Sequence, residues 1–320
     1  MFKNLDTSKK PKNIIDIFKW KIHSQQPKWP SLIPLEATDI PPQEVDNNIR
    51  ISYVGHVTFL IQTAKLNILT DPVWSERVSP FSFAGPKRVI QPGIKFEDLP
   101  KIDIILISHN HYDHLDIATI KKLWHRDRPR IITPLMNNLV LEANIPGIEV
   151  ITLDWGGMTS IDKLIDINLE PAQHWSARGI FDKNKALWGT FIVTIPSLGS
   201  ICFIGDTGYS HEIFNNIGQK YDILVSLIPI GAFEPRWFMK DIHINPEEAV
   251  FIHQNLRSKY SIASHFDVFQ LADEEFNQAP KELELAKKQY NINDEQFIVP
   301  KVSGCYWFNK ESRYFEEPAI

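Results

Sequence analysis

One segment of six residues gathers many of the metal-binding side chains in this sequence. It contains His109, His111, Asp113 and His114, so three imidazoles and a carboxylate are close neighbours. It follows a nearly continuous apolar run, residues 102–107, which is typical of a buried strand, and it precedes a helical pattern. Such a loop lies where a rigid scaffold meets solvent. This density of nitrogen and oxygen ligands suits two cations better than one, and borderline metals such as zinc favour it.

Three other strand ends offer the remaining ligands that a two-metal site needs. His174 follows the apolar run 164–169, Asp206 follows the run 201–204, and His265 ends a short apolar stretch. An aspartate that directly follows a buried strand, with glycines around it, is poorly explained by packing. Its carboxylate can bridge two metals, or it can cap a turn.

The elements that must position these side chains are strands first and then strands mixed with helices. Short apolar runs predict strands at residues 51–54, 58–61, 66–69, 102–107, 164–169, 190–195, 201–204 and 223–228. Helices are expected after Asp116, which suits an N-cap, and after Asn245, where Pro246 and Glu248 complete a strong helix start. This order predicts a layered α/β domain over residues 51–320, with residues 1–50 as an arm packed on it.

Composition and charge are ordinary for a soluble globular protein. The chain has 320 residues, 43% of them hydrophobic, which is enough to bury a sizeable core. Its formal net charge of -5 gives no argument for nucleic-acid binding, so no nucleic-acid partner is expected. Cys202 and Cys305 stand far apart, in no metal or redox spacing, and are expected to be reduced thiols. Without a signal-peptide core or a membrane-length apolar run, we expect a cytoplasmic protein, with peripheral contact at the inner membrane surface left open.

Longer motifs resemble the metallo-β-lactamase superfamily, and most of all its branch of N-acyl-phosphatidylethanolamine-hydrolysing phospholipases D. The likeness covers about residues 50–290. It rests on residues 55–56, 69–72, 85–88, 108–116, 205–209 and 231–240. The run 234–240, followed by His243, is much more specific to that branch than the other motifs. The resemblance implies an αββα sandwich of two mixed β-sheets flanked by helices, and it suggests a homodimer.

The same resemblance implies a centre of two Zn²⁺ ions, with manganese or iron as alternatives. It assigns the first metal to His109, His111 and His174, the second to Asp113, His114 and His265, and the bridge to Asp206. Because they would hold the metals that activate the water, Asp113 and Asp206 are expected to be catalytic residues as well. Asp71 should orient a ligand histidine through a carboxylate–imidazole hydrogen bond. His56 has either a supporting role of that kind or a structural hydrogen bond. His243 is expected to orient substrate or transfer a proton, unless it is a water-exposed histidine at a helix start.

The predicted function is a metal-dependent phosphodiesterase of the phospholipase D type. The resemblance over residues 234–240 and at His243 implies that it hydrolyses N-acyl-phosphatidylethanolamine-like phospholipids to N-acylethanolamine and phosphatidate. Two cations that share a water would lower its pKa towards neutrality and so supply the hydroxide. Tyr112, Arg236 and Trp237 are candidate substrate contacts, although the two aromatic side chains could equally support the fold.

Two other functions stay open. One is a hydrolase of the same fold, a lactonase or phosphodiesterase, with a small soluble substrate. The other is a non-enzymatic membrane-binding protein with a residual metal site. Residues 266–269 and 302–306 depart from the branch, and the first 50 residues carry little recognisable signal. Since these segments could shape substrate choice, the metal chemistry is better defined than the substrate.

Overall fold

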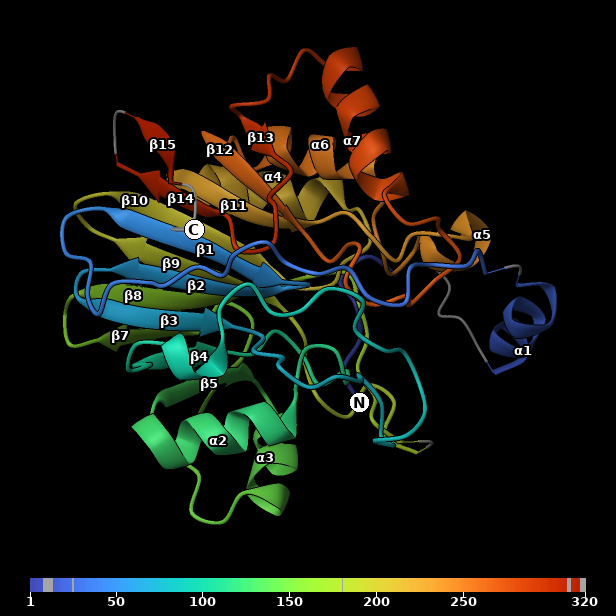
Figure 1. The fold of residues 1–320 in the computed structure, drawn as a ribbon, viewed down its shortest axis with the longest axis horizontal. Coiled ribbons are helices and arrows are strands. Elements are labelled where there is room, and N and C mark those ends of the chain that lie inside the picture. The colour runs from blue at the N-terminus through green and yellow to red at the C-terminus, as the bar shows by residue number, and fades with distance from the viewer. Residues whose placement is uncertain (8–13, 25, 180, 310–311, 317–320) are drawn as a thin grey trace.

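A computed structural model describes residues 1–7, 14–24, 26–179, 181–309 and 312–316. It contains two β-sheets packed face to face (Figure 1). The first sheet has the order β15 (Arg313–Glu316), β14 (Cys305–Phe308), β1 (Ile49–Gly55), β2 (Thr58–Thr63), β3 (Leu66–Thr70), β4 (Ile104–Leu106), β5 (Arg130–Pro134) and β6 (Val150–Leu153). The second has the order β13 (Phe297–Ile298), β12 (Tyr260–Ser264), β11 (Ile223–Pro229), β10 (Gly199–Ile204), β9 (Thr190–Ile195), β8 (Ile165–Glu170) and β7 (Met158–Ile161).

Helices cover both outer faces of the two sheets. Figure 1 shows α2 (Ile117–Asp127) and α3 (Asn138–Asn144) beside the first sheet, and α4 (His211–Lys220), α6 (Pro246–Asn255) and α7 (Gln278–Gln289) beside the second. The predicted caps are present, because the Asp116 carboxylate accepts backbone N–H groups at the start of α2 and Asn245 forms a capping box with Glu248. The αββα sandwich predicted from the sequence is therefore confirmed.

The core lies mainly between the two sheets. Ile51, Phe59 and Ile68 of the first sheet belong to the same buried cluster as Phe191 and Phe203 of the second. Burying one side chain of this size contributes about 1.5–3 kcal/mol, so the many contacts of this cluster hold the sheets firmly together. The strand ends that carry the metal-binding residues therefore rest on a rigid base.

The strand register brings one expected side chain onto the metal loop. β3 and β4 are parallel, with Thr70 opposite Leu106, so Asp71 lies beside the residues that lead into the loop. β4 itself is shorter than the predicted run 102–107, because the N–H of Ile102 is bonded to the Asp127 carboxylate instead of to a neighbouring strand.

The first part of the segment that precedes β1 packs on the second half of the chain, whereas residues 33–43 contact residues of the first half. In Figure 1, α1 (Ile14–His23) lies close to α5 (Arg236–Met239). The ring of Trp20 stacks on Phe238 with 5.0 Å between centroids, and its Nε1 donates to Asp273. Residues 8–13 and 25 of the predicted arm lie outside the described residues. Within the part of the chain that the structure describes, no helix combines the length and the apolarity needed to cross a bilayer.

Candidate metal centre

The seven side chains proposed as metal ligands lie together at one edge of the sandwich. They form two groups that share Asp206. We call His109, His111 and His174 the histidine half, and Asp113, His114 and His265 the carboxylate half. Within the histidine half and Asp206, the candidate ligand atoms all lie within 4.8 Å of one another, and the same holds for the carboxylate half together with His56.

In the histidine half, three ring nitrogens face one another. His111 Nδ1 lies 2.8 Å from His109 Nε2 and 3.3 Å from His174 Nε2. A tetrahedral zinc ion with Zn–N bonds of about 2.0–2.1 Å separates its nitrogen ligands by about 3.3 Å. The distance from His111 to His174 matches this spacing, whereas the 2.8 Å from His111 to His109 has to widen by about 0.5 Å to hold an ion. In two of these rings, the nitrogen that points away from the centre has a hydrogen-bond partner. His109 Nδ1 lies 3.0 Å from Ser108 Oγ, and His174 Nδ1 lies 2.9 Å from the carbonyl oxygen of Ile242.

The histidine half favours uncharged imidazole. Burial, together with neighbouring histidines, lowers the pKa of His109 and of His174 well below the usual value. Burial lowers the pKa of His111 to about 4. Because only neutral imidazole has a nitrogen lone pair free to bind a metal, these three rings are in the form that a cation requires at neutral pH.

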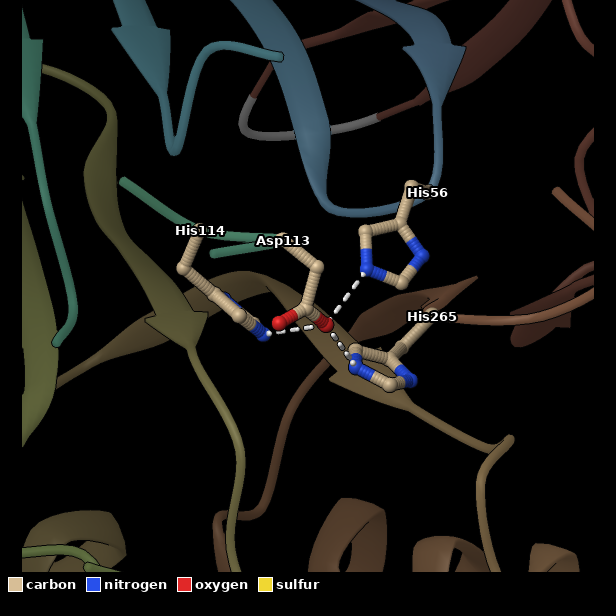
Figure 2. Close-up of side chains that lie close together, drawn as sticks. All are labelled: His56, Asp113, His114 and His265. Carbon is tan, nitrogen blue, oxygen red and sulfur yellow. Dashed lines mark hydrogen bonds and ion pairs between the residues drawn. The ribbon is translucent and has the colours of Figure 1, made fainter. Parts of the chain in front are cut away.

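In the carboxylate half, three histidines surround one carboxylate oxygen (Figure 2). Asp113 Oδ2 lies 3.0 Å from His56 Nε2, 3.3 Å from His114 Nε2 and 3.3 Å from His265 Nε2. Burial alone would raise the pKa of Asp113, but the charge of His114 and hydrogen bonds from the surrounding histidines hold it well below its usual range. The carboxylate is therefore ionised, as a metal ligand must be.

Asp71 holds His114 from the side opposite the metal-facing nitrogen. Its Oδ2 lies 2.7 Å from His114 Nδ1, and its two oxygens also accept bonds from the N–H and the hydroxyl of Ser108. A carboxylate in this position fixes the proton on Nδ1, leaves the Nε2 lone pair for a metal and makes the ring more basic. The structure thus pairs Asp71 with His114 among the expected ligand histidines.

Asp206 lies between the two halves. Its Oδ2 is 3.2 Å from His114 Nε2, 3.5 Å from His174 Nε2 and 3.7 Å from His109 Nε2, while its Oδ1 is 3.1 Å from His265 Nε2. Both oxygens therefore point at ring nitrogens, and the carboxylate reaches ligands of each half. This is the position that a bridging ligand requires.

Several of these atoms are buried without a hydrogen-bond partner. They are Asp206 Oδ1, His111 Nε2, His114 Nε2, His265 Nε2, His265 Nδ1 and His56 Nδ1. Leaving a buried polar atom unsatisfied costs about 1–3 kcal/mol, so a protein rarely gathers so many at one place. Three of these atoms, His114 Nε2, His265 Nε2 and Asp206 Oδ1, face the middle of the cluster, where orphaned nitrogens and oxygens fit the binding of cations between them.

His243 lies beside the shared carboxylate. Its Nε2 is 3.9 Å from Asp206 Oδ2, and its ring centroid is 5.2 Å from that of His174 and 5.6 Å from that of His265. Its side chain is only 13% exposed, which contradicts the alternative of a water-exposed histidine. Burial lowers its pKa to about 4, so the ring is neutral at pH 7.

The three expected substrate contacts differ in their surroundings. Tyr112 donates its hydroxyl proton to the carbonyl of Arg178, whose guanidinium lies 3.9 Å from the tyrosine ring centroid. Arg236 donates to the carbonyl of His243, and it forms an ion pair of 2.8 Å with a carboxylate at the start of α6. Trp237 is 49% exposed. A direct role in substrate binding stays a prediction for all three.

Sequence reasoning assigned no role to several residues that support the site. Ser108 links Asp71 to the metal loop, and Arg178 donates to the carbonyls of Asn110 and Leu115 within or beside that loop. Asn4 bonds to His174 from a segment more than 160 residues away in the sequence. Ser108 directly precedes the ligand His109 in the sequence, and this position could have indicated its supporting role. Asn4 carries no sequence signal, because only the folded chain brings it to the site.

Comparisons with known proteins agree with this geometry. A family model described as a β-lactamase superfamily domain matches residues 66–266. The chain is 37% identical over 270 residues to N-acyl-phosphatidylethanolamine-hydrolyzing phospholipase D 1 of Caenorhabditis elegans, which covers 79% of this chain and 74% of that protein. It is 32% identical over 296 residues to N-acyl-phosphatidylethanolamine-hydrolyzing phospholipase D, mitochondrial, of Saccharomyces cerevisiae. That match covers 84% of this chain but 63% of the yeast protein, less than two thirds of its length.

A solved structure gives the same fold. Igni18, a metallo hydrolase of the archaeon Ignicoccus hospitalis, superposes with a TM-score of 0.60 at 21% identity, over 82% of this chain and 99% of that one. At this identity the likeness concerns the fold, whereas the family follows from the sequence matches. The chain therefore belongs to the metallo-β-lactamase superfamily and is a metal-dependent hydrolase.

Proposed function

We propose that this protein is a phosphodiesterase of the phospholipase D type that uses two zinc ions. Its substrates are N-acyl-phosphatidylethanolamine-like phospholipids. Water adds to phosphorus, the bond from phosphorus to the ethanolamine oxygen breaks, and the products are phosphatidate and N-acylethanolamine. The two relatives at 37% and 32% identity, whose names state this activity, support the proposal.

One structural observation carries the proposal beyond the general family. The segment from Glu234 to His243, whose sequence resembles the lipid-hydrolysing branch, folds onto the metal centre. Arg236 donates to the carbonyl of His243 over 2.9 Å and also bonds Glu248 of α6, so the segment is held at both ends. This arrangement keeps His243 Nε2 3.9 Å from the carboxylate of Asp206.

The side chains around the centre would divide the work of the reaction. Bound cations supply positive charge for the phosphate oxygens and lower the pKa of a water towards neutrality. Asp206 reaches ligands of both halves, so it would fix the distance between the two cations. His243, neutral and beside this carboxylate, would orient the phosphodiester, or take the proton that the attacking water loses and pass it to the leaving ethanolamine oxygen.

A cavity beside the metal loop supports a lipid substrate. It has a volume of about 890 Å³ and is lined by apolar side chains such as Leu115, Leu139 and Phe81, and also by the charged side chains of Glu76, Arg77, Asp116 and Arg178. Ligand sites typically have volumes of about 300–1,000 Å³, so this cavity has room for an acyl chain. Two of its lining residues, Tyr112 and Leu115, are sequence neighbours of the metal ligands, although none of the seven candidate ligands lines it.

We further propose peripheral contact with the inner membrane surface. Phe81, Phe83 and Phe181 are 56%, 80% and 85% exposed, and the first two rings lie 5.6 Å apart. Large apolar side chains exposed in this way favour insertion into a lipid surface. Replacing Phe81 and Phe83 with alanine should weaken vesicle binding, whereas Leu285→Ala, at an exposed position on α7, should not.

The activity is tested with purified, zinc-loaded protein and vesicles that contain N-acyl-phosphatidylethanolamine. Release of N-acylethanolamine is measured for the wild type, His109→Ala and His125→Ala. His125 is an exposed histidine on α2, so its replacement is the matched control. We expect release by the wild type and the control, and at least a 10³-fold lower rate for His109→Ala, roughly the effect of losing several kcal/mol of metal stabilisation.

The outcomes separate the three functions. Hydrolysis of a soluble phosphodiester or a lactone, with none of the lipid, would overturn the lipid assignment and favour the small-substrate hydrolase. Vesicle binding without any hydrolysis, unchanged by His109→Ala and Asp206→Ala, would favour a non-enzymatic membrane-binding protein. Gel filtration with light scattering tests the suggested homodimer.

A further inference from the structure

Residues 2–6 form a strap over the loop that carries His174. On one side of the strap, the N–H of Phe2 donates to the carbonyl of Asn184 over 2.8 Å. On the other side, the side chain of Gln173 donates to the carbonyl of Asp6 over 3.1 Å. These two bonds fix the strap on either side of Asn4.

The carboxamide of Asn4 bonds to the backbone of His174 in both directions. Its Nδ2 donates to the His174 carbonyl over 2.8 Å, and its Oδ1 accepts from the His174 N–H over 3.0 Å. Oδ1 also accepts from Nε1 of Trp188 over 3.1 Å, and Trp188 is fully buried. The carboxamide is therefore locked between a rigid ring and the backbone of a candidate metal ligand.

His174 depends on this support more than His109 does. His109 follows β4 by three residues, and its ring is held by Ser108, which Asp71 fixes in turn. His174 follows β8 by four residues, in a loop outside the strands, and both of its backbone polar groups bond to Asn4. With the backbone fixed by Asn4 and Nδ1 fixed by the carbonyl of Ile242, the ring can present only Nε2 to a metal.

We propose that Asn4 is a positioning residue for the histidine half. It holds the backbone of His174 so that Nε2 completes the three-nitrogen site. The inference rests on the two-metal centre of the proposed function, but not on the identity of the substrate, so metal binding alone tests it. A failed lipid assay would leave it standing.

The experiment titrates metal-free full-length protein with Co²⁺ and follows the visible absorption of the bound ion. In the wild type we expect two binding steps. Asn4→Ala and the nearly isosteric Asn4→Leu should weaken one step about 10–100-fold and change its spectrum, as the loss of a partner that orients a ligand does. Asn138→Ala, at a half-buried position of α3 where the amide bonds to Glu142, is the matched control and should bind as the wild type does.

A double-mutant cycle shows whether Asn4 acts through His174. His174→Ala keeps the backbone groups but removes the ring, so adding Asn4→Ala to it should cost no further affinity. The inference is overturned if both Asn4 variants bind two ions as the wild type does. It is also overturned if Asn4→Ala weakens both steps equally, or weakens binding as much in the His174→Ala background. Thermal unfolding of the metal-free variants separates a loss of fold from a loss of ligand geometry.

Discussion

The two halves of the metal centre use similar side chains but are supported differently. In the carboxylate half, Asp71 bonds the outer nitrogen of His114, and His56 bonds the carboxylate of Asp113. In the histidine half, uncharged groups take these places, namely the hydroxyl of Ser108 and the carbonyl of Ile242. A carboxylate behind an imidazole makes it a stronger ligand than a carbonyl does, and a charged ligand attracts a cation more strongly than a neutral one.

The difference predicts two unequal sites. The histidine half contributes three neutral rings. In the carboxylate half, burial is outweighed by Asp206 and Asp113, which raise the pKa of His114 and raise that of His265 to about 9, so an ion must displace protons there. Once these protons are displaced, the charge of ionised Asp113 favours the cation. We therefore expect the carboxylate half to bind its ion first and to release it last when a chelator is added. The histidine half, which also depends on the strap, is expected to be the site where metal exchanges.

The largest effect should come from the residue that both halves share. Asp206→Asn keeps the volume but removes the negative charge that faces ligands of both halves. We expect bound zinc to fall below one ion per chain and hydrolysis to fall by about 10³-fold or more, because the metals supply most of the charge stabilisation. Metal analysis and a rate assay measure this, with Asp162→Asn, at an exposed position, as the control. Two ions retained with full activity would show that the halves do not depend on a shared carboxylate.

A smaller effect, confined to one half, is expected from Asp71→Asn. The amide cannot hold the proton of His114 Nδ1 as a carboxylate does, and it weakens the bonds to Ser108. Affinity in the carboxylate half should fall about 10–100-fold. Competition with a chromophoric chelator measures the two sites separately. A larger loss of metal affinity in the histidine half would contradict the prediction that Asp71 acts through His114.

His56 should have a smaller effect again. His56 has a φ of 60°, a left-handed conformation that asparagine tolerates, so His56→Asn removes the bond to Asp113 with little backbone strain. We expect about a tenfold loss of affinity in the carboxylate half, since Asp113 itself remains. A loss as large as that of Asp113→Ala would instead make His56 a metal ligand, which its place in the cluster of Figure 2 would also allow.

Local patterns in the sequence predicted a layered α/β domain and the hexapeptide loop, whereas the αββα sandwich came from the resemblance to the superfamily. Ligands at strand ends, the caps at Asp116 and Asn245, and the alternating elements are all encoded within a few residues. The strap could not be predicted in this way, because the bond from Asn4 to His174 spans 170 positions and neither residue type signals it. The pairing of Asp71 with His114 follows from the register of β3 and β4, which a single sequence does not specify.

Asp267 gives the smallest effect on the metal centre, and it shows how a buried acid behaves outside the histidine clusters. Burial raises its pKa to about 6, against the hydrogen bond from the N–H of Asn277 and the charge of Lys281. Because the folded pKa lies above the unfolded one, the carboxylate costs stability that develops as pH rises from about 4 to 6 and is complete above that range. Asp267→Asn keeps the acceptor for Asn277 and suits the φ of 55° at this position.

We therefore expect Asp267→Asn to raise the free energy of unfolding at pH 8 by about 1–2 kcal/mol, after the loss of attraction to Lys281, and to leave it unchanged near pH 4. Metal affinity and activity should remain those of the wild type. Urea unfolding at the two pH values measures the difference. An equal gain at both pH values would assign the effect to packing instead of ionisation. A gain in unfolding free energy only at high pH would show that the ionised carboxylate of Asp267 destabilises the fold. At Asp113 and Asp206, by contrast, several histidines surround the buried carboxylate and stabilise its charge.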